Sequence, residues 1–289
     1  MDARERHTAF GTSHPAVPAL YLVVTLTLTM SAMQPVLIAL SLAGGAAYGV
    51  ASRGLRSVIA ALRWQLPLIA LIALVNPLFS ASGSTELFRV GERAVYLESL
   101  CYGVAMGGLF VASALWFQAA SQMLGFDRVM ALLGNAAPLI ALMISMVMRL
   151  IPRLLRQGRA IIAAQDAVSV PDRSRGDAVG QRLRASSVLM DWAMEDSLET
   201  ADAMRARGWG AVPRRSTYTR YRFTRTDAVA VTGLAVAGAL CCFAAWLATS
   251  QYAFYPVMGR LVAWWGYAPY VAWMLLPCAL HLRERRLFS

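Results

Sequence analysis

Long uncharged apolar segments alternate with short polar ones along most of the chain. The segments without any charged residue are 7–52, 64–85, 99–126, 129–148, 228–259 and 261–282. A helix needs about 20 apolar residues to cross the roughly 30 Å hydrocarbon layer, so each segment is long enough for at least one span. The pattern predicts an all-α, polytopic helical membrane protein. Without short alternating segments, a transmembrane barrel is not expected.

Helix breakers divide the N-terminal half into its elements. Residues 19–50 predict two short helices bent back at Pro35, and a third helix is expected from about residue 64 to 79. The mixed-charge stretch 86–98 is expected outside the membrane. Residues 99–120 then return the chain to the inside.

The segment 129–148 is the exception to this regular crossing. A full crossing there would place the arginine-rich region that follows on the outside, against the positive-inside rule. Gly134 and Pro138 interrupt the segment and leave only Leu139–Leu150 as continuous helix, which is too short to span. We therefore expect a tilted or re-entrant segment.

One long polar insertion divides the chain into three domains. The N-terminal membrane domain covers 1–148, with about four spans and the re-entrant segment. The polar region covers 149–227, and residues 228–289 form a C-terminal membrane hairpin with a basic tail.

The charge distribution orients these domains. The net charge is +11, and all 27 basic residues are arginine because the chain has no lysine. Arginine gathers at 53–63, at 149–227 and at 283–286, which places these segments and the C-terminus in the cytoplasm. Arginine-rich loops beside spans explain the basic character better than nucleic-acid binding, which we do not expect.

No residue pattern typical of an enzyme or a metal site is present in the sequence. The four cysteines have no CxxC spacing, and the three histidines are far apart with no HExxH motif. A Walker A loop requires a lysine. The sequence thus predicts a chain that is no enzyme and binds neither a metal nor a cofactor itself.

The polar region contains two helical patterns, separated by a breaker-rich linker at 170–177. The first runs from Arg149 to about Ser169, and its arginines could lie against lipid headgroups. The second runs from about Ser187 to Arg207 and ends at Gly208, a natural C′ residue. Small residues on the second helix predict a narrow face for close packing against another helix: Ala193, Ser197, Ala201, Ala203 and Ala206.

Residues 197–208, with the sequence SLETADAMRARG, resemble the second Ala-Arg-Gly motif of the transmembrane T component of energy-coupling factor (ECF) transporters. The cobalt-permease Q subunit belongs to the same family. The resemblance covers most of the chain, with matching elements at Ser13-His14-Pro15, at Asn76-Pro77-Leu78-Phe79 and at Arg149-Leu150-Ile151-Pro152.

This resemblance implies a coupling scaffold in a prokaryotic plasma membrane. Two crossing cytoplasmic helices would dock on two ABC-type ATPases, which bind ATP and Mg²⁺, while the membrane part holds a substrate-binding S component. ATP closure would tilt the S component and release a vitamin or metal ion inside. The S component would select that cargo, so this chain does not identify it.

By this resemblance, Ala206, Arg207 and Gly208, with Arg205, would contact an ATPase. An arginine fork pairs with carboxylates at two points, and a glycine at the helix end permits a sharp left-handed exit. Ser197, Ala201 and Ala203 would serve the helix crossing or an S-component contact.

The first Ala-Arg-Gly motif of the family is degenerate in this chain. Ala164, Gln165 and Ala167 remain as candidate ATPase contacts, but Val168 and Ser169 replace the arginine and the glycine. The acidic residue usual after the Ile-Pro element is Gln157 here. The arginine's role is therefore not carried over to Val168.

Two interpretations of Asn76 remain open. Its amide could satisfy backbone groups that Pro77 leaves unpaired, or it could contact the S component.

For the chain as a whole, the alternative function is an autonomous secondary transporter or channel. That class needs buried charges along a pathway, and Arg260 is the only charge between residues 228 and 282. A membrane enzyme would need a cluster of catalytic side chains, which is equally missing from the spans.

Overall fold

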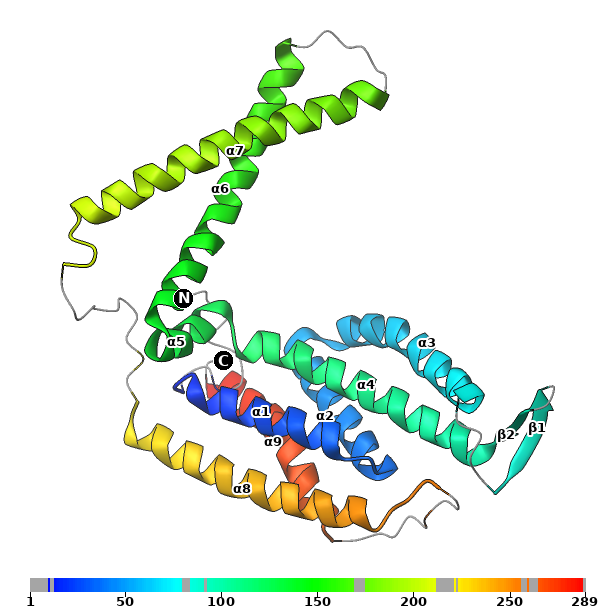
Figure 1. Cartoon of the computed structure of the whole chain (residues 1–289). Coiled ribbons are helices and arrows are strands. Elements are labelled where there is room, and N and C mark those ends of the chain that lie inside the picture. The colour runs from blue at the N-terminus through cyan, green and yellow to red at the C-terminus, as the bar shows by residue number, and fades with distance from the viewer. Residues whose placement is uncertain are drawn as a thin grey trace. The chain divides into compact units, whose positions relative to one another are not determined.

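The computed structural model describes residues 10, 13–79, 84–90, 93–168, 175–211, 221, 223–255, 259 and 265–287. Over these ranges the chain forms nine helices and one two-stranded antiparallel hairpin (Figure 1). The predicted all-α polytopic fold is confirmed. Two compact units are present: residues 1–129 together with 221–289, and residues 130–220.

The elements of the first unit are α1 (Ala16–Ser31), α2 (Pro35–Arg53), α3 (Leu55–Phe79), β1 (Glu86–Val90), β2 (Arg93–Tyr96), α4 (Leu97–Met123), α8 (Arg225–Ser250) and α9 (Tyr267–Leu287). Helix α5 (Phe126–Ala136) contains the boundary between the units, and the second unit contains α6 (Pro138–Val168) and α7 (Arg175–Ala206). Within the described ranges, α2, α3, α4, α6 and α8 are long and apolar enough to cross a membrane.

Large aromatic side chains fill the core of the first unit. Trp116, Tyr21, Tyr48 and Tyr270 are the largest fully buried side chains in the described residues. Several polar groups in this core bond to one another, as lipid offers no alternative partner. The Trp116 indole donates to the Ser41 hydroxyl at 3.0 Å, and the Trp273 indole donates to Thr25 at 2.9 Å. The first bond connects α4 with α2, and the second connects α9 with α1.

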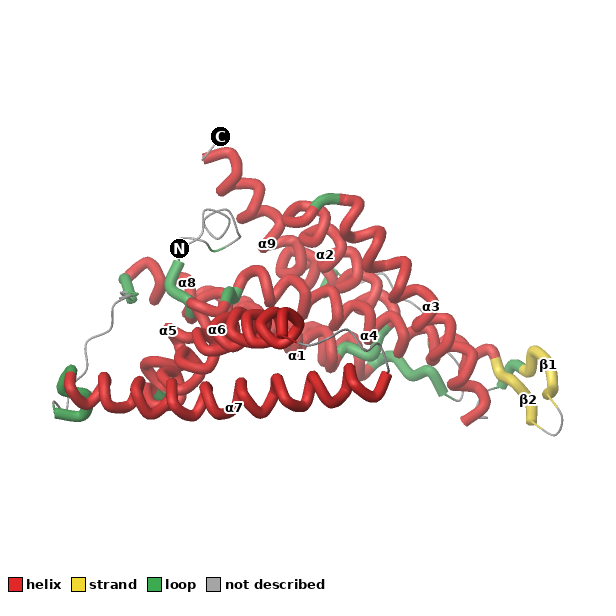
Figure 2. Tube along the Cα trace, turned by 90° about the horizontal axis from the view of Figure 1, so that it is seen from above, coloured by secondary structure: helices red, strands yellow, loops and turns green. Residues whose placement is uncertain are grey.

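Helices α3 and α4 pack closely enough to exclude a Cβ atom. A Cβ added at Gly103 would lie 2.8 Å from the Cα of Ala73, and one at Gly107 would lie 2.9 Å from the Cα of Ile69. Close approach through paired small residues is typical of helix packing in membranes. Figure 2 shows the two helices side by side, with the hairpin at their far end.

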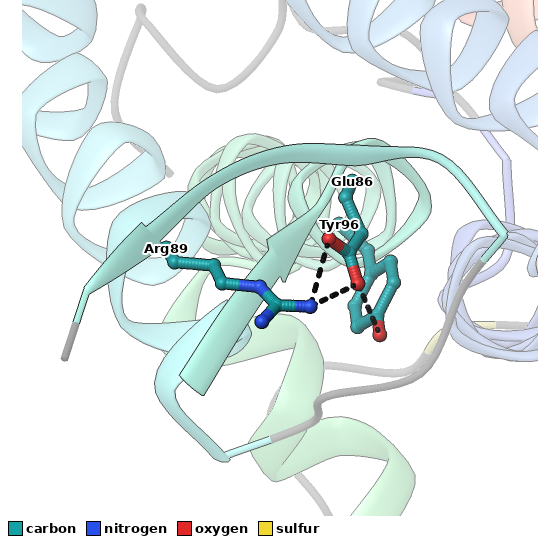
Figure 3. A network of polar contacts seen from close by, with 3 residues as sticks. All are labelled: Glu86, Arg89 and Tyr96. Atoms are coloured by element: carbon teal, nitrogen blue, oxygen red, sulfur yellow. Dashed lines mark hydrogen bonds and ion pairs between the residues drawn. The ribbon is translucent and has the colours of Figure 1, made fainter. Parts of the chain in front are cut away.

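The β1–β2 hairpin occupies the stretch that the sequence placed outside the membrane. Arg89 pairs with Glu86 at 3.2 Å, and the Tyr96 hydroxyl donates to the same carboxylate at 3.5 Å (Figure 3). The hydrogen bond to Glu86 raises the pKa of the Arg89 guanidinium. At the base of the hairpin, the buried Glu98 carboxylate accepts hydrogen bonds from the hydroxyls of Ser84 and Thr85, both at 2.9 Å.

Three predicted helix boundaries are confirmed. Pro35 is the first residue of α2, directly after Gln34. Pro138 is likewise the first residue of α6, and α5 ends shortly before it at Ala136. Gly208 follows the end of α7. Proline at a first helical position lacks an N–H that would be unpaired there anyway, so the two starts follow from local chemistry.

Other predicted boundaries are wrong. Helix α3 begins at Leu55, not near residue 64, so Arg56 and Arg63 lie within it. Helix α6 continues unbroken through Leu150 for 31 residues, so 139–150 is no short segment. Arginine, leucine, glutamine and alanine are good helix formers, so the change from apolar to polar residues at Arg149 does not end the helix.

The compact units also differ from the three predicted domains. Residues 130–148 group with the polar region, and the two membrane domains form one unit. The breaker-rich linker is shorter than predicted, because α7 already begins at Arg175. Helix α9, the second helix of the predicted C-terminal hairpin, begins at Tyr267.

Candidate functional site: the crossed helices

Helices α6 and α7 contact each other within the second unit and cross in Figure 1. A stripe of partly buried residues follows one face of α6 at helical spacing: Leu150, Leu154, Gln157, Ile161 and Gln165. On α7, Ala185 and Asp196 are buried, with Leu189 and Trp192 partly buried on the same side. The i, i+4, i+7 spacing of these residues places each stripe on a single helix face.

An ion pair lies at this crossing. Arg153 Nη1 lies 2.5 Å from Asp196 Oδ1, and the Asp196 side chain is only 9% exposed. The Arg153 guanidinium also lies 5.2 Å from the ring centroid of Trp192. A buried carboxylate is costly without a partner, so Arg153 both neutralises Asp196 and stacks on the neighbouring indole.

The C-terminal end of α7 forms a Schellman motif. The Gly208 N–H donates to Arg205 O at 2.9 Å, and the Trp209 N–H donates to Met204 O at 3.0 Å. Gly208 has a φ of +78°, in the left-handed region that favours glycine. The predicted C′ position of Gly208 is thus confirmed.

This helix end leaves two arginines exposed to solvent. Arg205 lies 3.8 Å from Asp202, and both side chains are highly exposed, so the ion pair contributes little to the stability of the helix. Arg207 makes no side-chain hydrogen bond or ion pair within the described part of the chain. The Arg207 guanidinium is therefore available to an external carboxylate.

Replacing Gly208 with alanine should destabilise this helix end. A Cβ in the left-handed conformation is expected to cost about 1 kcal/mol and to loosen the last turn of α7. Hydrogen exchange at the amides of residues 207–209 should become several-fold faster. Gly180→Ala is the matched control, because Gly180 lies inside α7 with nothing within 4 Å of an added Cβ. That change should stabilise the helix by up to about 1 kcal/mol.

The remains of the first motif lie at the C-terminal end of α6. Ala164 and Ala167 are exposed, whereas Gln165 is partly buried on the stripe that faces α7. Val168 is the last residue of α6, with its side chain not described, and Ser169 lies outside the described residues. Both motif segments therefore occupy the C-terminal ends of their helices.

Of the five small residues predicted to form the packing face of α7, only Ala193 is partly buried. Ser197, Ala201, Ala203 and Ala206 are exposed, and the buried side chains of α7 lie nearer its N-terminus. Small size permits a close approach but does not direct one. Trp192 offers a large apolar surface for contact with α6, and the buried Asp196 carboxylate requires its partner Arg153 on that helix.

Asn76 links two helices. Its Nδ2 donates to the backbone oxygen of Ser99 at 2.7 Å, which joins α3 to the start of α4. The sequence left open whether the amide serves the backbone groups left unpaired by Pro77 or contacts the S component, and the bond to Ser99 was not foreseen by either interpretation. The observed bond crosses to α4 because the glycine contact at Gly103 brings the two helices within reach.

The Ser13-His14-Pro15 element is attached to the start of α8. The His14 N–H donates to Asp227 Oδ1 at 3.1 Å, and the His14 ring lies edge-on to Phe223 at 5.2 Å. Asp227 also completes a capping box with Thr224. This network fixes the point at which the chain re-enters the first unit, a role that sequence spacing alone could not reveal.

The ion pair of Arg153 and Asp196, with Trp192 beside it, was not identified from the sequence. Arg153 belongs to the arginines of the first helical pattern, which the sequence placed against lipid headgroups, and Asp196 lies within the second helical pattern without any feature that singles it out. Their facing positions depend on how two helices cross, which no local pattern encodes. The only local signal was the i, i+4 spacing of Trp192 and Asp196.

Comparison with known proteins gives one partial similarity. No family model matches the chain. Over 93 residues the chain is 32% identical to Uncharacterized protein MG181 of Mycoplasma genitalium, a match that covers 32% of this chain and 22% of that protein. The chain thus spans about a fifth of the length of this relative. No group of three or more potential metal ligands occurs among the described residues.

Proposed function

We propose that this chain is the transmembrane coupling subunit of an ECF-type ABC importer. The observation that supports this best is the pair of long crossed helices, one of which ends in an exposed Arg205-Ala206-Arg207-Gly208 segment held by a Schellman motif. A stiff helix with arginine donors at its end suits docking into an acidic groove on a separate subunit.

In this proposal the chain transmits movement and performs no chemistry. Two ABC-type ATPases bind ATP and Mg²⁺ and move the ends of α6 and α7 as they close. The membrane helices hold a substrate-binding S component, whose reorientation delivers a vitamin or metal ion to the cytoplasm. The protein then lies in a prokaryotic plasma membrane, with its C-terminus and crossed helices on the cytoplasmic side.

The location of the buried charges in the first unit favours a scaffold function rather than an autonomous transporter or channel. Glu98, Arg128 and Asp227 are all buried, but each lies near a helix end and bonds to nearby backbone groups. Arg128, for example, donates to the oxygens of Phe10 and Met123 at 3.2 and 3.1 Å. Such charges stabilise helix junctions and do not lie in the middle of the described spans, where a transport pathway would need them.

Affinity purification of the full chain in mild detergent tests the proposal. We expect two ABC-type ATPases and a small apolar membrane protein to co-purify with it. If the chain is instead an autonomous transporter or channel, neither the ATPases nor the small membrane protein should co-purify with it. Accumulation of solute by liposomes that contain this chain alone, or hydrolysis of ATP by the chain alone, would contradict the proposal.

A further inference from the structure

We propose that the Arg153–Asp196 ion pair is the positioning element that locks α6 against α7 and carries movement from one to the other. This inference rests on the proposed coupling function and names the residues that transmit movement between the two helices. The three partners are the buried Asp196 carboxylate, the Arg153 guanidinium 2.5 Å away and the Trp192 ring beside it.

The lengths of the two helices show why a lock is needed. At 1.5 Å rise per residue, Arg207 lies about 16 Å beyond Asp196 along α7, and Pro138 lies about 22 Å before Arg153 along α6. Each helix therefore extends well past the ion pair. Two rods in contact over a limited length swivel or slide unless their register is fixed at more than one point, and a directional contact restricts it more than apolar packing alone.

The directional contact is made by the ion pair. A carboxylate and a guanidinium bond only in a narrow range of geometries, and the ring of Trp192 restricts the guanidinium further. Nearly one helical turn before Trp192, Leu189 packs against α6, where its Cδ2 would lie 3.6 Å from a Cβ at Gly158. The pair and this packing contact define both the position and the rotation of α7 on α6.

The degenerate first motif gives the lock particular importance in this chain. Val168 and Ser169 stand at the end of α6 where the family pattern has arginine and glycine. Force from the ATPases then enters mainly through Arg207 at the end of α7. It reaches the apolar first half of α6, which exposes Leu139, Ile140, Met143 and Val147, by way of the crossing.

A distance measurement on the purified chain tests the lock directly. Spin labels at Arg159→Cys and Ser187→Cys, both exposed positions, report the separation of α6 and α7 after the four native cysteines, which are all free, are replaced. We expect a narrow distance distribution, which Asp196→Asn broadens at least twofold. The charge exchange Arg153→Asp with Asp196→Arg should narrow it again. Glu195→Gln, which removes an exposed neighbouring carboxylate, should leave it unchanged.

Transmission is tested in the complex with its co-purified ATPases. A bimane fluorophore at Ile140→Cys should respond to Mg-ATP with vanadate in the otherwise unaltered chain. Asp196→Asn should reduce this response at least fivefold while the ATPases remain bound, and the charge exchange should restore it. A protein that only needs the ion pair for folding would lose ATPase binding and response together.

The outcomes separate the two proposals. Unchanged distances in Asp196→Asn, or a full bimane response, would overturn the lock. A full-length chain that captures no ATPase would contradict the proposed function, and the distance measurement would still decide whether the ion pair fixes the crossing.

Discussion

Replacing Arg207 with glutamate is expected to abolish co-purification of the ATPases while leaving the chain in the membrane. Arg207 is exposed, lies directly before Gly208 and makes no side-chain hydrogen bond or ion pair in the described part of the chain. Reversing its charge places a carboxylate against the acidic groove that we propose on the partner, where like charges repel. Recovery of ATPase per molecule of chain, measured by quantitative immunoblot after affinity purification, should fall about tenfold or more.

Two further variants show whether the effect belongs to this position. Arg184→Glu makes the same charge change at an exposed site in α7, far from the helix end, and should bind ATPase normally. Arg207→Lys keeps the charge but loses the planar fork, so an intermediate loss is expected. Normal recovery with Arg207→Glu would remove Arg207 from the interface.

Helix boundaries that depend on local chemistry could be predicted from the sequence. Pro35 and Pro138 start helices because proline restricts the backbone, and Gly208 ends one because it tolerates a positive φ. Long uncharged segments likewise predicted the membrane character, since the cost of charge in lipid applies at any position along a span.

Features that a hydropathy pattern does not contain could not be predicted in this way. The early start of α3 and the unbroken course of α6 reflect helix propensities that a hydropathy pattern does not contain. The β1–β2 hairpin was missed because its strands are only 5 and 4 residues long. Asp196 resembles its exposed acidic neighbours in sequence and differs from them only through its partner on α6.

The candidate site was accordingly only half predictable. The motif at residues 205–208 lies within one helix end, and its exposed geometry agrees with the expectation from the sequence. The crossing involves two helices whose register depends on Trp192 and Asp196, whereas four of the five small residues that suggested it are exposed. The sequence was enough to locate the exposed end of α7, and the structure was needed to locate the ion pair that holds α7 on α6.

The glycine contact between α3 and α4 leads to the second large effect, Gly103→Ala. The added Cβ would lie 2.8 Å from the Cα of Ala73 and 2.9 Å from the Cβ of Asn76, and a backbone atom cannot move aside as a flexible side chain can. The helices must separate, which also stretches the 2.7 Å bond from Asn76 to Ser99. We expect the free energy of unfolding to fall by about 1–3 kcal/mol, visible as a lower melting temperature in detergent.

The control is Gly233→Ala, on an open face of α8 with nothing within 4 Å of an added Cβ, which should be neutral or slightly stabilising. Equal melting of the two variants would mean that α3 and α4 do not pack this closely in the folded protein.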